Sequence, residues 1–131
     1  MIRCAITDRR RADPLASAMK AIAEGVDYIQ VREKDLDARD LYALCCAIRD
    51  AAAGTSTRVL VNGRLDVALA ANLDGVHLPA DGLPASRVRP FVRYLGVSIH
   101  SAEEATAAAQ SKANFVVLDR KSTRLNSSHV S

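Results

Sequence analysis

Polar side chains that could bind an anion occupy alternate positions where a short apolar segment of the sequence ends. Gln30, Arg32 and Lys34 alternate with Val31 and Glu33. In an extended chain alternate residues point the same way, so an amide, a guanidinium and an ammonium group share one face. These groups suit a phosphate or pyrophosphate ligand, whereas the alternative is a solvated charged loop.

Later apolar segments also end in residues that could bind a ligand or move a proton. Asn62 follows one of them, Ser98 and His100 follow another, and His77 lies at the end of a third. Histidine can take up and release a proton near neutral pH, so His77 and His100 are residues that chemistry could use. The alternative for His100 is a hydrogen-bonded wall residue, and for His77 a structural role is favoured.

Apolar periodicity divides the sequence into alternating strands and helices. Strands are predicted at residues 2–6, 26–31, 59–61, 75–78, 94–97 and 114–118. Helices are predicted at residues 14–24, 36–53, 65–71, 84–91 and 102–110. The alternation indicates parallel strands joined by crossover helices, in an open doubly wound sheet or a closed barrel. The first loop lacks a Gly-x-Gly-x-x-Gly motif and the strands follow one another closely, which favours the barrel.

The predicted fold is an incomplete TIM (β/α)8-type barrel over residues 1–119. About six of the eight strand–helix units of such a barrel are present. Because the active sites of these barrels lie at the carboxyl ends of the strands, the polar residues above would meet at one end. Six strands do not close the barrel, so we expect no measurable turnover by these 131 residues alone.

Helical spacing predicts which side chains face the core and where one helix begins. Met19 belongs to the apolar stripe of the first helix, and Leu69 to that of the third, so both are expected to be buried. Ser101 is followed three residues later by Glu104. This spacing is typical of a capping box and predicts the start of the last helix.

Residues 120–131 differ from the rest of the chain. They are rich in Ser, Arg and Asn and show no apolar periodicity, so we expect them to be disordered. The string resembles translated adapter or cloning sequence, which predicts that the native frame ends near Leu118. The alternative is a genuine polar terminus.

Composition and charge argue against several classes of partner. Three of the 18 basic residues lie in residues 120–131, and the others are matched by the 15 acidic residues. A globular part without basic excess argues against nucleic acid. No apolar run approaches the roughly 20 residues that cross a membrane, and no secretory signal is recognisable. A cytoplasmic protein is therefore expected.

Four ordered blocks resemble a known enzyme family. Gln-Val-Arg-Glu-Lys at residues 30–34 resembles the Gln-x-Arg-Glu-Lys signature of thiamine phosphate synthases. The later blocks of that family are similar to Val-Asn-Gly-Arg-Leu-Asp-Val-Ala-Leu-Ala at residues 61–70, Asp-Gly-Val-His-Leu at 74–78 and Leu-Gly-Val-Ser-Ile-His-Ser at 95–101. The thiazole tautomerases of the TenI type share this fold and much of this pattern.

The resemblance implies a reaction and a set of substrate contacts. A synthase of this family joins hydroxymethylpyrimidine diphosphate to a thiazole phosphate and releases pyrophosphate. By resemblance, Gln30, Arg32, Lys34 and Asn62 would bind the diphosphate substrate. Ser98 would contact the same substrate near the leaving group. The implied partners are phosphorylated pyrimidine and thiazole small molecules.

Two positions depart from the family pattern where the resemblance implies magnesium ligands. Gly63 and Gly82 stand where the synthases carry aspartates, and Asp81 is one position early. Mg²⁺ prefers carboxylate oxygens, so Asp81 is the candidate metal ligand that is left. The two glycines favour a tautomerase, which needs an acid and a base such as His100, or a non-catalytic phosphate-binding module.

Overall fold

The computed structural model of this chain describes residues 1–119. Its strands are β1 (Cys4–Ile6), β2 (Tyr28–Val31), β3 (Arg58–Asn62), β4 (Gly75–Leu78), β5 (Tyr94–Ile99) and β6 (Phe115–Leu118). Its helices are α1 (Pro14–Ala23), α2 (Ala38–Ala52), α3 (Leu65–Ala70), α4 (Ala85–Val88), the 3₁₀ turn η1 (Arg89–Phe91) and α5 (Ala102–Gln110). The tail predicted for residues 120–131 lies outside the described residues.

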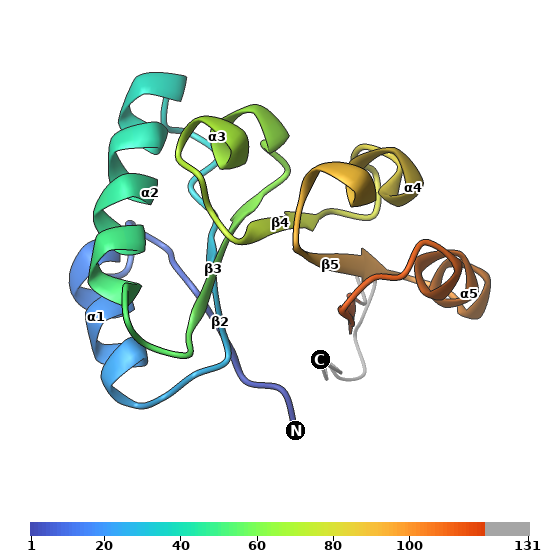
Figure 1. Cartoon of the computed structure of the whole chain (residues 1–131), viewed down its shortest axis with the longest axis horizontal. Coiled ribbons are helices and arrows are strands. Elements are labelled where there is room, and N and C mark those ends of the chain that lie inside the picture. Colours follow the sequence, from blue (N-terminus) through green and yellow to red (C-terminus); the bar gives the residue numbers. More distant parts are fainter. Residues whose placement is uncertain (120–131) are drawn as a thin grey trace.

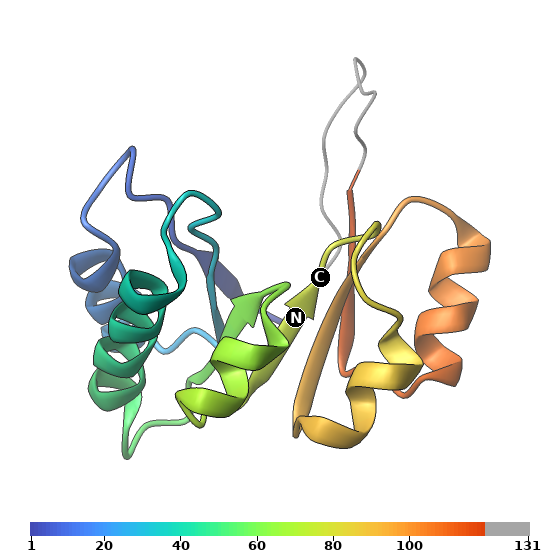
Figure 2. The same cartoon turned by 90° about the horizontal axis from the view of Figure 1, so that it is seen from above.

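The strands form one parallel sheet in which the spatial order is the chain order. β1 pairs with β2, and each later strand pairs with the one before it, through to β6. A doubly wound sheet would reverse its order at a switch point, and this sheet does not. The sheet curls, and the helices lie along its outer side (Figures 1 and 2). The predicted incomplete TIM-type barrel is confirmed as a curled half-barrel.

Each strand sends alternate side chains to two different environments. The outward set packs against the helices in one apolar cluster, which explains why the strands are rich in β-branched residues. Its strand members include Ile29, Val31, Val59, Val61, Val76, Leu78 and Leu95. On the helices, Leu41, Cys45 and Ile48 of α2 complete much of this cluster. The outward layer thus buries most of the apolar area of the chain.

The inward set includes several aromatic rings beside the buried aliphatic side chain of Leu60. Tyr28 on β2 reaches Phe115 on β6, with ring centroids 4.5 Å apart. Tyr94 lies edge-on to Tyr28 at 6.1 Å, and His77 lies 5.7 Å from Phe115. These rings bridge β2 and β6 across the inside of the curled sheet, so they hold its curvature from within.

Two glycines on the inner face allow a close approach, Gly75 of neighbouring backbone and Gly96 of two of these rings. A Cβ atom on Gly75 would lie 1.8 Å from the backbone oxygen of Tyr94. A Cβ atom on Gly96 would lie 2.5 Å from Phe115 Cζ and 2.6 Å from His77 Nδ1. Any larger residue at either position would have to displace backbone or a packed ring.

The helix starts follow from local capping, and one of them differs in detail from the prediction. Ser101 accepts a hydrogen bond from the backbone N–H of Glu104 at 3.1 Å, as the capping-box spacing predicts. The Glu104 carboxylate accepts from the backbone N–H of His100 rather than from that of Ser101. Glu104 therefore holds the backbone of His100, which lies just before α5 begins.

Two side chains predicted to face the core are exposed. Met19 is 55% exposed because α1 buries the stripe Pro14, Ala18 and Ala21 instead. Leu69 is 52% exposed, whereas its helix α3 buries Val67 and Ala68. A helix of only six residues turns too few apolar positions inward for the periodicity to assign its face. No helix among residues 1–119 is long and apolar enough to cross a membrane.

Replacing the inward glycines tests the packing of the concave face. Gly75→Ala is expected to lower the free energy of unfolding by about 3 kcal/mol or more, because its obstacle is backbone. Gly96→Ala is expected to cost about 1–2 kcal/mol, because a side-chain ring can shift. Urea unfolding followed by circular dichroism measures both. An unchanged midpoint for Gly75→Ala would contradict the packing described.

Candidate active site

The carboxyl ends of β2 and β3 are joined by a hydrogen bond between two amide side chains. Asn62 Nδ2 donates to Gln30 Oε1 at 2.8 Å, and Gln30 is only 3% exposed. The bond uses the oxygen of Gln30 and leaves its two amide N–H groups for another acceptor. The structure thus brings together two of the residues predicted to bind substrate, although they are 32 positions apart.

The face predicted for Gln30, Arg32 and Lys34 extends less far along the strand than the alternation indicates. β2 ends at Val31, and Lys34 lies in the following turn. The backbone N–H of Arg32 donates to the Oγ1 atom of buried Thr7 at 3.0 Å. The side chains of Arg32 and Lys34 are exposed and have no ion-pair partner within residues 1–119. Two free cationic groups therefore stand at this end of the sheet.

Glu33 anchors the loop that follows β1. Its carboxylate is 5% exposed and accepts the backbone N–H of Arg9 with both oxygens, each at 3.1 Å. The Arg9 guanidinium lies 3.9 Å from Glu33 and 2.6 Å from Asp35. Arg9 is thus paired with two carboxylates of the segment that follows β2. The negative charge of Glu33 is partly balanced within the protein by Arg9.

A cavity of about 210 Å³ lies between the ends of β2 and β3. Lys34 and Asn62 line it together with Glu33, Leu36, Leu41, Gly63 and Arg64. Arg64 is paired with Asp66 at 3.0 Å, which leaves Lys34 as the unpaired cation of this wall. The cavity offers an ammonium group and an amide from two adjacent strands, as an anionic ligand requires.

The ends of β4 and β5 are joined by a second polar pair. His77 Nε2 lies 2.9 Å from Ser98 Oγ, and His77 is 2% exposed. Burial, together with the smaller effect of the positive charge of Arg32, lowers the pKa of His77 to about 4. The ring is therefore neutral at pH 7. The effect of Arg32 also shows that the ends of β2 and β4 are electrostatically linked.

His100 stands apart from these pairs. It is exposed just beyond β5, where its Nε2 atom lies 3.9 Å from the Asp119 carboxylate. Its backbone N–H is held by Glu104. A carboxylate near an imidazole can stabilise its protonated form, and the sequence pattern alone did not indicate Asp119 as a neighbour of His100.

The residues at the implied magnesium positions do not fit an ion held by two carboxylates. Gly63 and Gly82 offer no side-chain oxygen, and Asp81 is exposed in the loop after β4. At Gly82 a Cβ atom would lie 2.9 Å from the Pro79 ring, so this loop is also too tight for a simple aspartate replacement. In the described part of the chain, no group of three or more His, Cys, Asp or Glu side chains could hold a metal ion.

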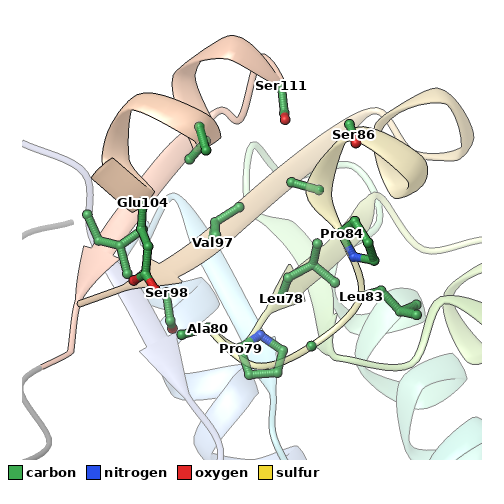
Figure 3. A pocket seen from close by; sticks show the side chains of 15 residues that line it. Leu78, Pro79, Ala80, Leu83, Pro84, Ser86, Val97, Ser98, Glu104 and Ser111 are labelled. Carbon is green, nitrogen blue, oxygen red and sulfur yellow. The ribbon is translucent and has the colours of Figure 1, made fainter. Parts of the chain in front are cut away.

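A second cavity, of about 290 Å³, lies where the ends of β4 and β5 meet α4 and α5 (Figure 3). Its walls are largely apolar and include Leu78, Pro79, Val97, Ile99, Ala107 and Ala108. Ser98 and Glu104 are its polar members near one another in Figure 3. The sequence pattern did not indicate this cavity, because its walls come from three stretches that are separate along the chain.

Two buried polar residues that support the site were missed from the sequence. Thr7 Oγ1 accepts a hydrogen bond from the backbone N–H of Arg32, 25 positions away. The Glu33 carboxylate accepts one from the backbone N–H of Arg9, 24 positions away. The sequence shows that a polar residue lies beside the end of a strand, but it does not show which backbone N–H group that residue binds. Alternation even placed Glu33 on the face opposite Lys34, whereas both line the same cavity.

The fold and these residues define a TIM-type enzyme family, and comparison with known proteins identifies it. Residues 3–120 match the family model described as thiamine monophosphate synthase. The chain therefore belongs to the thiamine monophosphate synthase family. This confirms the resemblance carried by the four sequence blocks.

Relatives and solved structures agree with this assignment. A Geobacter sulfurreducens relative is 44% identical over 117 residues, covering 85% of this chain and 55% of its own. The thiamine-phosphate synthase of Methanoculleus marisnigri is 42% identical and is matched by 77% of this chain over 49% of its length. The structure of Pyrococcus furiosus thiamine phosphate pyrophosphorylase, 31% identical, superposes with a TM-score of 0.79, covering 86% of this chain and 57% of that one. The chain thus spans about half the length of the curated relatives it matches.

Removing the charge of Glu33 tests its role as an anchor. Glu33→Gln keeps one oxygen that can accept the Arg9 backbone N–H, but it removes the second acceptor oxygen and the negative charge. It is expected to lower the free energy of unfolding by about 1–3 kcal/mol in urea unfolding. Asp35→Asn is the matched control, because Asp35 meets Arg9 at an exposed position where ion pairs contribute little. Equal effects of the two variants would contradict the anchor.

The pKa of His77 predicts a pH dependence of stability. The unfolded chain takes up a proton on this histidine below pH about 6.5, whereas the folded chain does so only below about 4. Stability should therefore fall as pH drops from 6.5 to 4, by about 3 kcal/mol in all. His77→Gln should remove this part of the pH profile of urea unfolding. A difference profile that is flat across this window would show that His77 titrates normally.

Proposed function

We propose that this chain carries the diphosphate-binding part of a thiamine-phosphate synthase. The observation that carries the proposal is the convergence of donors at the carboxyl ends of β2 and β3. The Gln30–Asn62 pair leaves amide N–H groups free, and Arg32 and Lys34 add two unpaired cations beside it. The proposed ligand is hydroxymethylpyrimidine diphosphate, and the second substrate is a thiazole phosphate.

The proposed reaction exchanges one bond of the pyrimidine methylene carbon for another. The bond from this carbon to the diphosphate oxygen breaks, and its electron pair leaves with pyrophosphate. The cationic carbon is then captured by the thiazole nitrogen, which forms the new C–N bond. Arg32 and Lys34 stabilise the negative charge that develops on the leaving group, and the amides of Gln30 and Asn62 position it. Ser98 donates to the same group from β5.

Magnesium enters no step of this proposal. In the family it would neutralise the diphosphate, and Asp81 is the residue of this chain that would bind it. Because Gly63 and Gly82 supply no ligand, we assign the charge of the diphosphate to Arg32 and Lys34 instead. The thiazole phosphate site and complete turnover belong to the whole family protein, and we expect none from these residues alone.

A thiazole tautomerase is the second candidate, and one observation favours it. The His100 ring lies 3.9 Å from Asp119, in an arrangement that could move a proton without a metal. A tautomerase would bind one thiazole phosphate, so it would not need Arg32 and Lys34 to hold a diphosphate. A non-catalytic phosphate-binding module would use Arg32 and Lys34 alone, without His100.

Calorimetric titration of the chain with inorganic pyrophosphate tests the proposed site. Arg32→Ala and Lys34→Ala are each expected to weaken binding about tenfold or more, because each removes a charge-assisted hydrogen bond. Lys20→Ala is the matched control, since Lys20 is an exposed lysine on the outer helix α1. Binding should also weaken as salt is raised.

The outcomes separate the candidates. Equal affinities for Lys34→Ala and Lys20→Ala would contradict the proposed site. Because magnesium enters no step of the proposal, affinity for pyrophosphate is expected not to depend on added magnesium, and a strong dependence would contradict the assignment of the diphosphate charge to Arg32 and Lys34. A His100→Gln variant is expected to bind pyrophosphate normally, because none of the three candidate functions places His100 against the diphosphate.

A further inference from the structure

The hydrogen bond between His77 and Ser98 has a direction, and that direction decides what Ser98 can bind. His77 Nε2 and Ser98 Oγ lie 2.9 Å apart. β4 and β5 pair with His77 opposite Gly96, so Ser98 is the next inward position toward the carboxyl end. If the Ser98 hydroxyl donates to the ring, its hydrogen is used up. If it accepts from the ring, its hydrogen is free for a ligand.

One proton on the His77 ring sets this direction. The ring is buried among the inward side chains, its pKa is lowered to about 4, and Arg32 is the charged group that acts on it. A neutral imidazole has one N–H group and one lone pair. Either Nε2 carries the proton and donates to Ser98, or Nδ1 carries the proton and Nε2 accepts from Ser98.

The surroundings of Nδ1 indicate where the proton lies. Nδ1 is fully buried and has no hydrogen-bond partner within residues 1–119. It packs so closely on Gly96 that a Cβ atom there would be 2.6 Å away, and Phe115 covers the same side. A proton on Nδ1 would be a buried donor without an acceptor, which folded proteins rarely contain. A proton on Nε2 is used in the bond to Ser98.

We propose that His77 is a positioning residue whose Nε2–H donates to Ser98 Oγ and so frees the Ser98 hydroxyl hydrogen for an oxyanion. The ligand class is a phosphate or diphosphate oxygen, which only accepts hydrogen bonds. Ser98 then acts as a dedicated donor on β5, opposite the donors of β2 and β3. The ligand rests on the proposed function, whereas the position of the proton does not depend on it.

A long-range ¹H–¹⁵N correlation spectrum of the chain labelled with ¹⁵N-histidine tests the proton directly at pH 7. Protonated and unprotonated ring nitrogens have well-separated ¹⁵N shifts, and the carbon-bound ring protons tell Nε2 from Nδ1. The signals of His77 are those lost in His77→Gln. We expect a protonated Nε2 and an unprotonated Nδ1. A proton on Nδ1, or a charged ring, overturns the inference.

Titration with inorganic pyrophosphate tests the consequence for Ser98. Ser98→Ala should weaken binding about tenfold, and His77→Leu should weaken it by a similar factor. His77→Gln should stay within about threefold of the unchanged chain, because an amide N–H can replace Nε2–H as the donor. The Ser98→Ala, His77→Leu double variant should be no weaker than Ser98→Ala. Ser17→Ala on α1 is the control, and thermal melts establish that each variant is folded.

The outcomes distinguish this inference from the function on which its ligand rests. Pyrophosphate binding by the unchanged chain together with unaltered binding by Ser98→Ala overturns the role of Ser98. Binding by His77→Leu at full strength overturns the role of His77. Absence of any pyrophosphate binding by the unchanged chain overturns the proposed function and the oxyanion ligand, while the NMR spectrum still decides the position of the proton.

Discussion

The inside of the curled sheet has room for a few rings only, and the rest of the structure depends on how they are accommodated. Tyr28 and Phe115 meet across this space, and His77 packs on Phe115. Gly96 presents no side chain beside Phe115 and His77, and Gly75 lets the backbone of Tyr94 approach closely. The aliphatic side chain of Leu60 fills the space next to Gly75, so the concave face is packed by rings, one aliphatic side chain and two glycines together.

This packing separates the structural part of each strand from the part available for chemistry. The inward positions before the strand ends hold rings, Leu60 and glycines, and the inward positions at the carboxyl ends include Gln30, Asn62 and Ser98. Each of these is tied to a neighbouring strand by a hydrogen bond, so its position is set by the register of the sheet. His77 belongs to both parts, since one edge of its ring packs on Gly96 and the other binds Ser98.

The sequence predicted what depends on neighbours along the chain and missed what depends on contacts between distant segments. Apolar periodicity placed the strands, and the resemblance placed Gln30 and Asn62 at one site. The hydrogen bond between them joins positions 32 apart, which no local pattern contains. Alternation failed at Glu33 because β2 ends at Val31 and the carboxylate then turns to a backbone N–H. Met19 was misplaced because two stripes of α1 are apolar and the sheet covers one.

The distribution of charge supports the proposal that an anion is held without a histidine cation or a carboxylate-bound metal. The Glu33 carboxylate accepts the backbone N–H of Arg9 and lies 3.9 Å from its guanidinium, which reduces the repulsion between Glu33 and an anion. His77 is neutral because burial and Arg32 both lower its pKa, and it contributes a dipole rather than a charge. Arg32 and Lys34 are then the charged groups that we propose to face the anion. Affinity for the anion should accordingly follow ionic strength and the ionisation of the ligand itself.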